Sequence, residues 1–293
     1  MSNHCPIIRT GKTLGYTAEY VKYNSRVKLY PNDCGEWEPV QQLVCSRFVF
    51  NPDGAELISA PPRYYRPALP SEPTAPEELQ ARSLNRARAK LFDYVCCNPD
   101  LCNFVTLTFD GEKVAREDYA EVVKKFNQWT SNAVRRYGLK YLGVVERHHQ
   151  THGLHFHLLT NSALELQDSG TVKCAGKKKP IKVATADRYK IPYAERKVVY
   201  NLPQWRYGFS TAIEIDGEGA RQKVAHYVCK YLTKDVEKIG GRYYYHGGTL
   251  ESPRFVYGRV DFERVEADRQ FEIENSGIKY KVVYLNDSKD RNV

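Results

Sequence analysis

The sequence predicts an α+β fold with one central antiparallel sheet and helices on one face. Residues 103–109 alternate between apolar and other side chains, which is typical of a strand with one face in a core. A helical pattern over 116–137 follows, and then a hairpin over 140–160. Strands and helices that alternate around a hairpin favour a single sheet whose second face is open for a site.

The strand over 103–109 and the helix after it have the clearest patterns. One face of the strand carries Val105, Leu107 and Phe109, and the other carries Phe104, Thr106 and Thr108. The helix spaces its apolar side chains at Tyr119, Val122, Val123, Phe126 and Trp129. Gly138 follows where a left-handed C-cap is usual, so we expect the helix to end there.

The hairpin and two later elements complete the predicted sheet. Strands over 140–147 and 154–160 are joined by the polar turn 148–153. We expect a further strand over 209–215 and a helix over 217–238. The apolar side of that helix consists of Val224, Val228, Leu232 and Val236.

We expect three regions along the chain: an N-terminal extension over 1–99, a central domain over 100–240 and a β-rich C-terminal extension over 241–293. Within the central domain, residues 164–203 show few structural signals. This segment is expected to be an insertion or a mobile basic loop.

The N-terminal extension is the least informative region. Its best strand candidates are 26–30 and 43–50. A Pro-rich, polar stretch near 60–76 predicts a linker, and a helix is expected from Glu77 to about Tyr94.

The charge of the chain favours an anionic partner. The 293 residues have a formal net charge of +9 and a pI near 9.0, which suits nucleic acid, although the same excess could merely keep the protein soluble. The candidate phosphate contacts are Arg86, Lys178, Lys223 and Lys234. For the helix that carries Arg86, a solvated basic face is an equal alternative.

Cysteine usage and hydropathy indicate a soluble, non-secreted protein. The eight cysteines include no C-x-x-C pair, which favours reduced thiols over a disulfide framework. A zinc site formed by Cys96, Cys97 and Cys102 with Cys34 or Cys45 is the less favoured alternative, so we predict no structural zinc. No signal peptide or membrane span is evident, and we expect a location in the cytoplasm of a bacterial host cell.

A candidate metal site lies in the second strand of the hairpin. His155 and His157 share one face because successive side chains of a strand alternate. The short turn brings Glu146 of the first strand beside them. Two imidazoles and one carboxylate leave coordination positions open, and they suit Mn²⁺ as well as Mg²⁺. His148, His149 and His152 are rival ligands, but they lie in the turn, where their direction is not fixed.

A pair of tyrosines marks the expected helix over 217–238. Tyr227 and Tyr231 are four residues apart and therefore share a helix face. Lys230 and Lys234 each follow a tyrosine by three residues, and a cation beside a phenol favours the phenolate. The alternative is that the tyrosines are half-buried against the sheet and the lysines lie in water.

Taken together, these motifs resemble the HUH endonucleases, whose name refers to a histidine, a bulky apolar residue and a histidine, here His155-Phe156-His157. Residues 104–110 are similar to the first motif of replication initiators, and 227–231 to the tyrosine motif. The segment 243–253 also looks like the one that follows the tyrosine helix in phage and plasmid initiators. Two tyrosines that come after the histidines resemble the initiators of single-stranded DNA phages and some plasmids.

The resemblance implies a site-specific DNA nickase and ligase that starts rolling-circle replication. Tyr227 or Tyr231 would attack the scissile phosphate, with Lys230 beside them, and give a 5′-phosphotyrosine. The DNA would be single-stranded or extruded at an origin. Since the chain has no G-x-x-x-x-G-K-[ST] motif, a separate helicase is implied, as well as a polymerase.

Two other functions are compatible with parts of this pattern. One is a basic RRM-like module without enzymatic activity, in which His155 and Phe156 contact bases. The other is an HUH-type transposase, against which the paired tyrosines argue.

Overall fold

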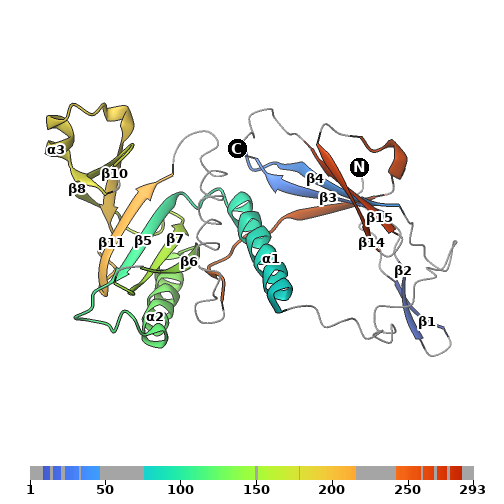
Figure 1. Ribbon diagram of the computed structural model, residues 1–293, viewed down its shortest axis with the longest axis horizontal. Coiled ribbons are helices and arrows are strands. Elements are labelled where there is room, and N and C mark those ends of the chain that lie inside the picture. The colour runs from blue at the N-terminus through green and yellow to red at the C-terminus, as the bar shows by residue number, and fades with distance from the viewer. Residues whose placement is uncertain are drawn as a thin grey trace. The chain divides into compact units, whose positions relative to one another are not determined.

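The computed structural model describes residues 9–13, 16–20, 24–32, 34–46, 76–148, 151–177, 179–215, 242–258, 260–266, 269–275 and 278–285. The chain divides into two compact units. Residues 1–75 and 253–293 form unit 1, and residues 76–252 form unit 2 (Figure 1).

Unit 2 is built on an eight-stranded sheet in the order β12-β6-β7-β5-β11-β10-β8-β9, with antiparallel neighbours. The strands are β5 (Asn103–Phe109), β6 (Tyr141–Arg147), β7 (Leu154–Thr160), β8 (Gln167–Cys174), β9 (Ile181–Lys182), β10 (Arg196–Asn201), β11 (Gly208–Glu214) and β12 (Tyr245–Gly247). The predicted hairpin is β6 and β7, and the predicted α+β class with a central antiparallel sheet is confirmed.

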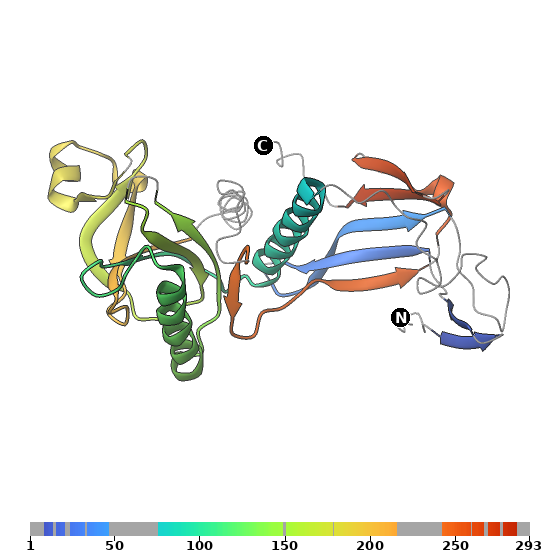
Figure 2. The ribbon, with the colours of Figure 1, turned by 60° about the horizontal axis from the view of Figure 1, so that its bottom comes forward.

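Helix α2 (Tyr119–Tyr137) covers one face of this sheet (Figure 2). The carboxylate of Asp118 accepts hydrogen bonds from the first backbone N–H groups of the helix, which explains why α2 begins at Tyr119. Gly138 has a φ of 69° and ends α2 as expected. Phe126 is fully buried and stacks on Phe156 of β7, with ring centroids 3.7 Å apart. This face is therefore the main core of the unit.

Helix α1 (Pro76–Cys97) packs on a second cluster of unit 2. Leu91 and Val95 of α1 are buried with Leu142 and Leu159, which lie on the opposite face from Phe156. The two long helices thus occupy both faces, whereas the sequence predicted helices on one face. The apolar alternation of a strand shows that a face is covered but not by which segment.

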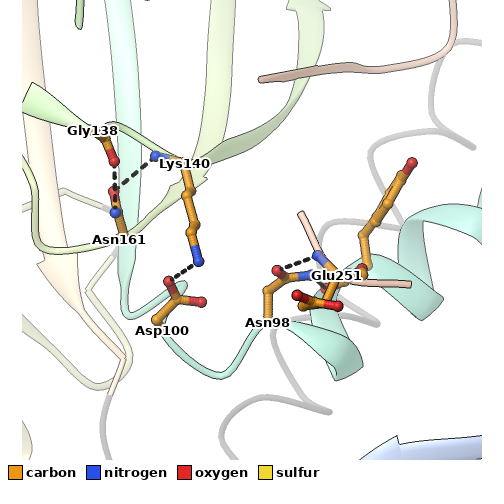
Figure 3. Close-up of polar contacts among 7 residues, drawn as sticks. Asn98, Asp100, Gly138, Lys140, Asn161 and Glu251 are labelled. Atoms are coloured by element: carbon orange, nitrogen blue, oxygen red, sulfur yellow. Dashed lines mark hydrogen bonds and ion pairs between the residues drawn. The ribbon is translucent and has the colours of Figure 1, made fainter. Parts of the chain in front are cut away.

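Polar contacts at one end of β6 and β7 connect several segments of unit 2 (Figure 3). Asn161 Oδ1 accepts from the backbone N–H of Lys140 at 3.0 Å, and Lys140 Nζ lies 2.8 Å from Asp100. Asn98 both donates to and accepts from the backbone of Glu251, at 3.0 and 2.9 Å. The segment before residue 252 is therefore attached to the end of α1.

Residues 164–203 are folded, so the expectation of a mobile loop is wrong for the described part of this segment. It forms β8, β9, α3 (Val183–Arg188), the 3-10 helix η1 (Tyr193–Glu195) and β10, and it extends the sheet beyond β11. Val172, Cys174 and Ala186 form a small core of its own. Such a small core needs few apolar residues. Because many lysines lie between them, the sequence of this segment shows no clear strand or helix periodicity.

Unit 1 contains a five-stranded sheet in the order β13-β3-β4-β15-β14. Its strands are β3 (Ser25–Pro31), β4 (Trp37–Cys45), β13 (Arg254–Gly258), β14 (Gln270–Asn275) and β15 (Ile278–Tyr284). A separate hairpin, β1 (Arg9–Thr13) and β2 (Tyr16–Tyr20), precedes them, and the 3-10 helix η3 (Phe262–Arg264) lies between β13 and β14.

The unit boundaries thus lie at residues 76 and 253 and differ from the predicted ones at 99/100 and 240/241. The difference arises because β3 pairs with β13 and β4 pairs with β15, across more than 200 residues of sequence. The predicted linker near 60–76 lies almost entirely outside the described residues. In the part of the chain that the structure describes, no helix is long and apolar enough to cross a membrane.

Candidate metal centre

The predicted metal ligands lie in two rows of side chains on the face of the sheet opposite α2. In the first row, Glu146, His155, Thr108 and Phe209 are register partners across β6, β7, β5 and β11. In the second row, Val144, His157, Thr106 and Thr211 are partners in the same way. Directly paired residues of a sheet project from the same face, so the strand pairing brings the candidate ligands together.

His157 is held on three sides. Its Nε2 lies 2.8 Å from Oε2 of Glu146, and its Nδ1 lies 3.1 Å from the hydroxyl oxygen of Thr106. The ring stacks on Phe104 at a centroid distance of 5.9 Å. The side chains of His157 and Glu146 are only 11% and 19% exposed. The imidazole is therefore fixed in direction and partly shielded from water.

His155 has a matching partner. Its Nδ1 lies 2.9 Å from the hydroxyl oxygen of Thr108, and its ring is tilted towards His148, 5.6 Å away between centroids. Burial, together with the neighbouring His157 and His148, lowers the pKa of His155 to about 4. At neutral pH this imidazole is uncharged, which is the form that binds a metal ion.

The two imidazoles and the Glu146 carboxylate are the kinds of ligand that a divalent cation binds. Threonine hydroxyls contact both Nδ1 atoms, so a metal ion would bind Nε2 of each ring, and at His157 it would replace the direct contact with Glu146. A hydroxyl can donate to Nδ1 or accept from it, so Thr106 and Thr108 serve either tautomer. Among the described residues no group of three or more His, Cys, Asp or Glu side chains is already gathered around a common point. In the structure, Glu146 and His157 instead contact each other directly.

The turn between β6 and β7 carries the rival histidines and a cation. His152 has a φ of 53°, and its N–H donates to the carbonyl of His148 at 2.8 Å. His149 lies outside the described residues. Arg116, from the loop before α2, lies against this turn: a Cβ added at Gly153 would come within 3.1 Å of its side chain. Its positive charge contributes to the low pKa of His155, so this guanidinium acts on the candidate site.

The predicted tyrosine helix lies outside the described residues, and so do Lys223, Tyr227, Lys230, Tyr231 and Lys234. The described residues on either side of this segment pack against the sheet of unit 2. Ile215 donates its N–H to the carbonyl of Cys102 at 2.7 Å and packs in the cluster of Leu142 and Leu159. Tyr243 packs in the same cluster. The described residues that flank the segment thus lie on the face that carries the histidines.

Of the other predicted DNA contacts, Arg86 is exposed on α1 and Lys178 lies outside the described residues. No sequence pattern predicted a role in the site for Thr106, Thr108, Arg116 or Phe209. Alternation had placed both threonines on the open face, but only the pairing of β5 with β7 brings them to the imidazoles. Phe209 is a large apolar side chain that is 72% exposed in the histidine row.

The sheet therefore defines an α+β protein with two oriented imidazoles and a carboxylate on the face opposite α2, in a basic chain. Residues 102–236, slightly less than half of the chain, match the model of a family described as Replication-associated protein, of the ORF2 type. The matched residues include β5, both histidines and both candidate tyrosines. Comparisons with characterised proteins and with solved structures found no match. The family match supports a role in phage DNA replication, with DNA as the partner.

Proposed function

We propose that unit 2 is a nicking and joining endonuclease that initiates rolling-circle replication through a tyrosine–DNA intermediate. The observation that carries the proposal is that Glu146, His155 and His157 share one sheet face, with a threonine hydroxyl at the Nδ1 atom of each imidazole. The family match supplies the process and the substrate class. The anchoring of Ile215 and Tyr243 on that face supports an approach of the tyrosine segment to the histidines.

Glu146, His155 and His157 would hold Mg²⁺ or Mn²⁺. When bound, the ion would act as a Lewis acid on the scissile phosphate. Thr106 and Thr108 contact the Nδ1 atoms and so leave the Nε2 atoms for the ion, on the sheet face opposite α2, where the phosphate would bind. Arg116 lies close enough to affect His155 and can contribute positive charge to the same phosphate.

In the cleavage step, the phenolic oxygen of Tyr227 or Tyr231 attacks phosphorus. The new P–O bond to tyrosine forms as the P–O3′ bond breaks, so the phenol loses a proton and the 3′ oxygen gains one. Lys230 favours the phenolate. Because one phosphodiester replaces another, the reverse reaction rejoins the strand without ATP. The free 3′-hydroxyl can then prime a polymerase supplied by another protein.

A second tyrosine would provide the nucleophile for the second strand transfer. After one round of synthesis the first tyrosine still carries the 5′ end, so closing the circle needs another nucleophile at the same site. Tyr227 and Tyr231, four residues apart on the expected helix, would alternate in this role. A single-tyrosine enzyme, in which Tyr231 only packs against the sheet, is the competing mechanism.

The proposal is tested by incubating the purified chain with single-stranded origin DNA and Mn²⁺. We expect a covalent adduct that survives SDS, disappears with EDTA and yields a tyrosine-linked nucleotide by mass spectrometry. If the tyrosine pair is real, Tyr227→Phe and Tyr231→Phe each retain some adduct, the double variant has none, and each single variant closes circles poorly. Loss of all adduct in Tyr227→Phe, with normal closure in Tyr231→Phe, would leave one catalytic tyrosine. No adduct under any condition would refute the nuclease.

A further inference from the structure

The folded insertion between β7 and β11 carries much of the positive charge of the chain and has no part in the site described above. Residues 164–203 contain nine Lys and Arg residues against four Asp and Glu residues. Its strands β10, β8 and β9 continue the same sheet. The small core of Val172, Cys174 and Ala186 shows that it is a defined structure that can hold side chains in fixed places.

Two tyrosines are displayed on the surface of this insertion. Tyr189 is 64% exposed and Tyr193 is 78% exposed. Such exposure is unusual for an aromatic ring, whose burial would stabilise the fold. Each ring also has a cation beside it: Lys177 Nζ lies 5.4 Å from the centroid of Tyr189, and Arg196 Cζ lies 4.2 Å from that of Tyr193.

The turn that carries the tyrosines is closed by backbone and side-chain hydrogen bonds. After α3 the N–H of Ile191 donates to the carbonyl of Ala186 at 3.1 Å, while Lys190 adopts a left-handed conformation with a φ of 51°. The guanidinium of Arg196 donates from Nε to the carbonyl of Ile191 at 2.8 Å. Its side chain is only 6% exposed and forms an ion pair with Asp187. The guanidinium of Arg196, itself fixed by these contacts, therefore lies against the ring of Tyr193 and limits its freedom.

From this arrangement we infer that Tyr189 and Tyr193 form a second site for single-stranded DNA, on which two bases stack while Lys177 and the surrounding cations bind phosphates. Single-strand binding surfaces combine aromatic platforms with positive charge in this way. Rings that are already held in place lose little conformational entropy when they bind. Stacking distinguishes this site from a merely solvated basic surface, which would need no exposed aromatic rings.

This second site depends on the proposed function in one respect: both assume that the substrate is single-stranded DNA. β10 is three strands from the histidine strand β7 in the order β7-β5-β11-β10, or about 14 Å across the sheet at ordinary strand spacing. Both tyrosines precede β10, whose C-terminal end is the one level with His157, so they lie further from the histidines than this spacing. A strand of several nucleotides spans such a distance. The insertion would thus hold DNA that flanks the nicked phosphate and contribute to affinity rather than to the chemical step.

The test is equilibrium binding of the full chain in EDTA, which prevents cleavage, to labelled oligonucleotides of about 6 and about 30 nucleotides. We expect Tyr189→Ala/Tyr193→Ala to weaken binding of the long strand about 10-fold or more and to leave the short strand, centred on the nick site, unchanged. Tyr189→Phe/Tyr193→Phe keeps both rings and should bind like the unaltered protein. Tyr137→Ala is the matched control, because Tyr137 is 50% exposed at the end of α2, outside the insertion.

Three results would overturn the inference. In the first, the Ala variant binds the long strand as tightly as the unaltered protein does. In the second, the Ala and Phe variants lose the same amount of affinity for the long strand. In the third, the Ala variant loses as much affinity for duplex DNA of the same length as for the single strand. The first would show no contact, the second a contact through the hydroxyls, and the third a contact to phosphates alone. Adduct formation is scored separately: tyrosine-dependent binding without any adduct would overturn the proposed nuclease and leave this site standing.

Discussion

Replacement of Thr106 by valine isolates the role of a single hydroxyl at the candidate metal centre. Valine has nearly the shape of threonine and equal preference for a strand, so β5 should keep its pairing with β7. The substitution removes the 3.1 Å hydrogen bond to Nδ1 of His157. Without that acceptor, the tautomer that exposes the Nε2 lone pair loses its stabilising partner.

The expected magnitude follows from the kind of contact. A neutral hydrogen bond contributes about 0.5–1.5 kcal/mol, and partners that orient metal-bound histidines typically change metal affinity about 10- to 100-fold. Since Thr106 supplies one neutral bond and Phe104 still stacks on the same ring, we expect the lower end. The Mn²⁺ concentration for half-maximal nicking should rise about 10-fold.

The assay is SDS-stable adduct formation on a single-stranded oligonucleotide over a series of Mn²⁺ concentrations, supported by calorimetric metal titration. Thr211→Val is the matched control, because Thr211 is exposed in the same row, one strand further along. The Mn²⁺ concentration for half-maximal nicking should not change in Thr211→Val. Thr106→Ser, which restores a hydroxyl, should return most of the affinity. An unchanged metal requirement in Thr106→Val would show that the hydroxyl does not orient His157.

Other substitutions test the site and its support. Glu146→Gln should raise the metal requirement while His152→Ala should not, and the opposite result would reassign the third ligand. His157→Ala should abolish nicking yet retain most of the salt-sensitive DNA binding measured by anisotropy, because phosphate contacts supply that affinity. Phe209→Ala should raise KM about 10-fold with little change in kcat, and Phe209→Trp should restore it if a base stacks there; a fall in kcat alone would exclude that role. Phe126→Ala should lower the free energy of unfolding by about 3–5 kcal/mol in urea titrations, since Phe126 is fully buried against Phe156, and a loss below 1 kcal/mol would contradict this packing.

The sequence alone determined three local elements of unit 2, namely β5, α2 and the hairpin of β6 and β7. Alternation identified β5, helical spacing with Gly138 identified α2, and two strand patterns with a short polar turn identified the hairpin of β6 and β7. These features depend on residues close together in the chain, whose backbone preferences act without help from distant segments. The short turn also predicted that Glu146 lies near the start of the histidine strand, and in the structure Glu146 pairs with His155.

Tertiary structure alone decided what surrounds those ligands. The pairing of β5 with β7 brings Thr106 and Thr108 to the imidazoles from about 50 residues away, and no local pattern encodes that register. The sheet shared by the two ends of the chain and the small core of residues 164–203 depend on contacts of the same kind. A strand pattern specifies which face is apolar, but its partner is chosen by the total packing of the fold. The sequence therefore indicated two histidines and an acid as candidate ligands, whereas the fold decided how these side chains are oriented.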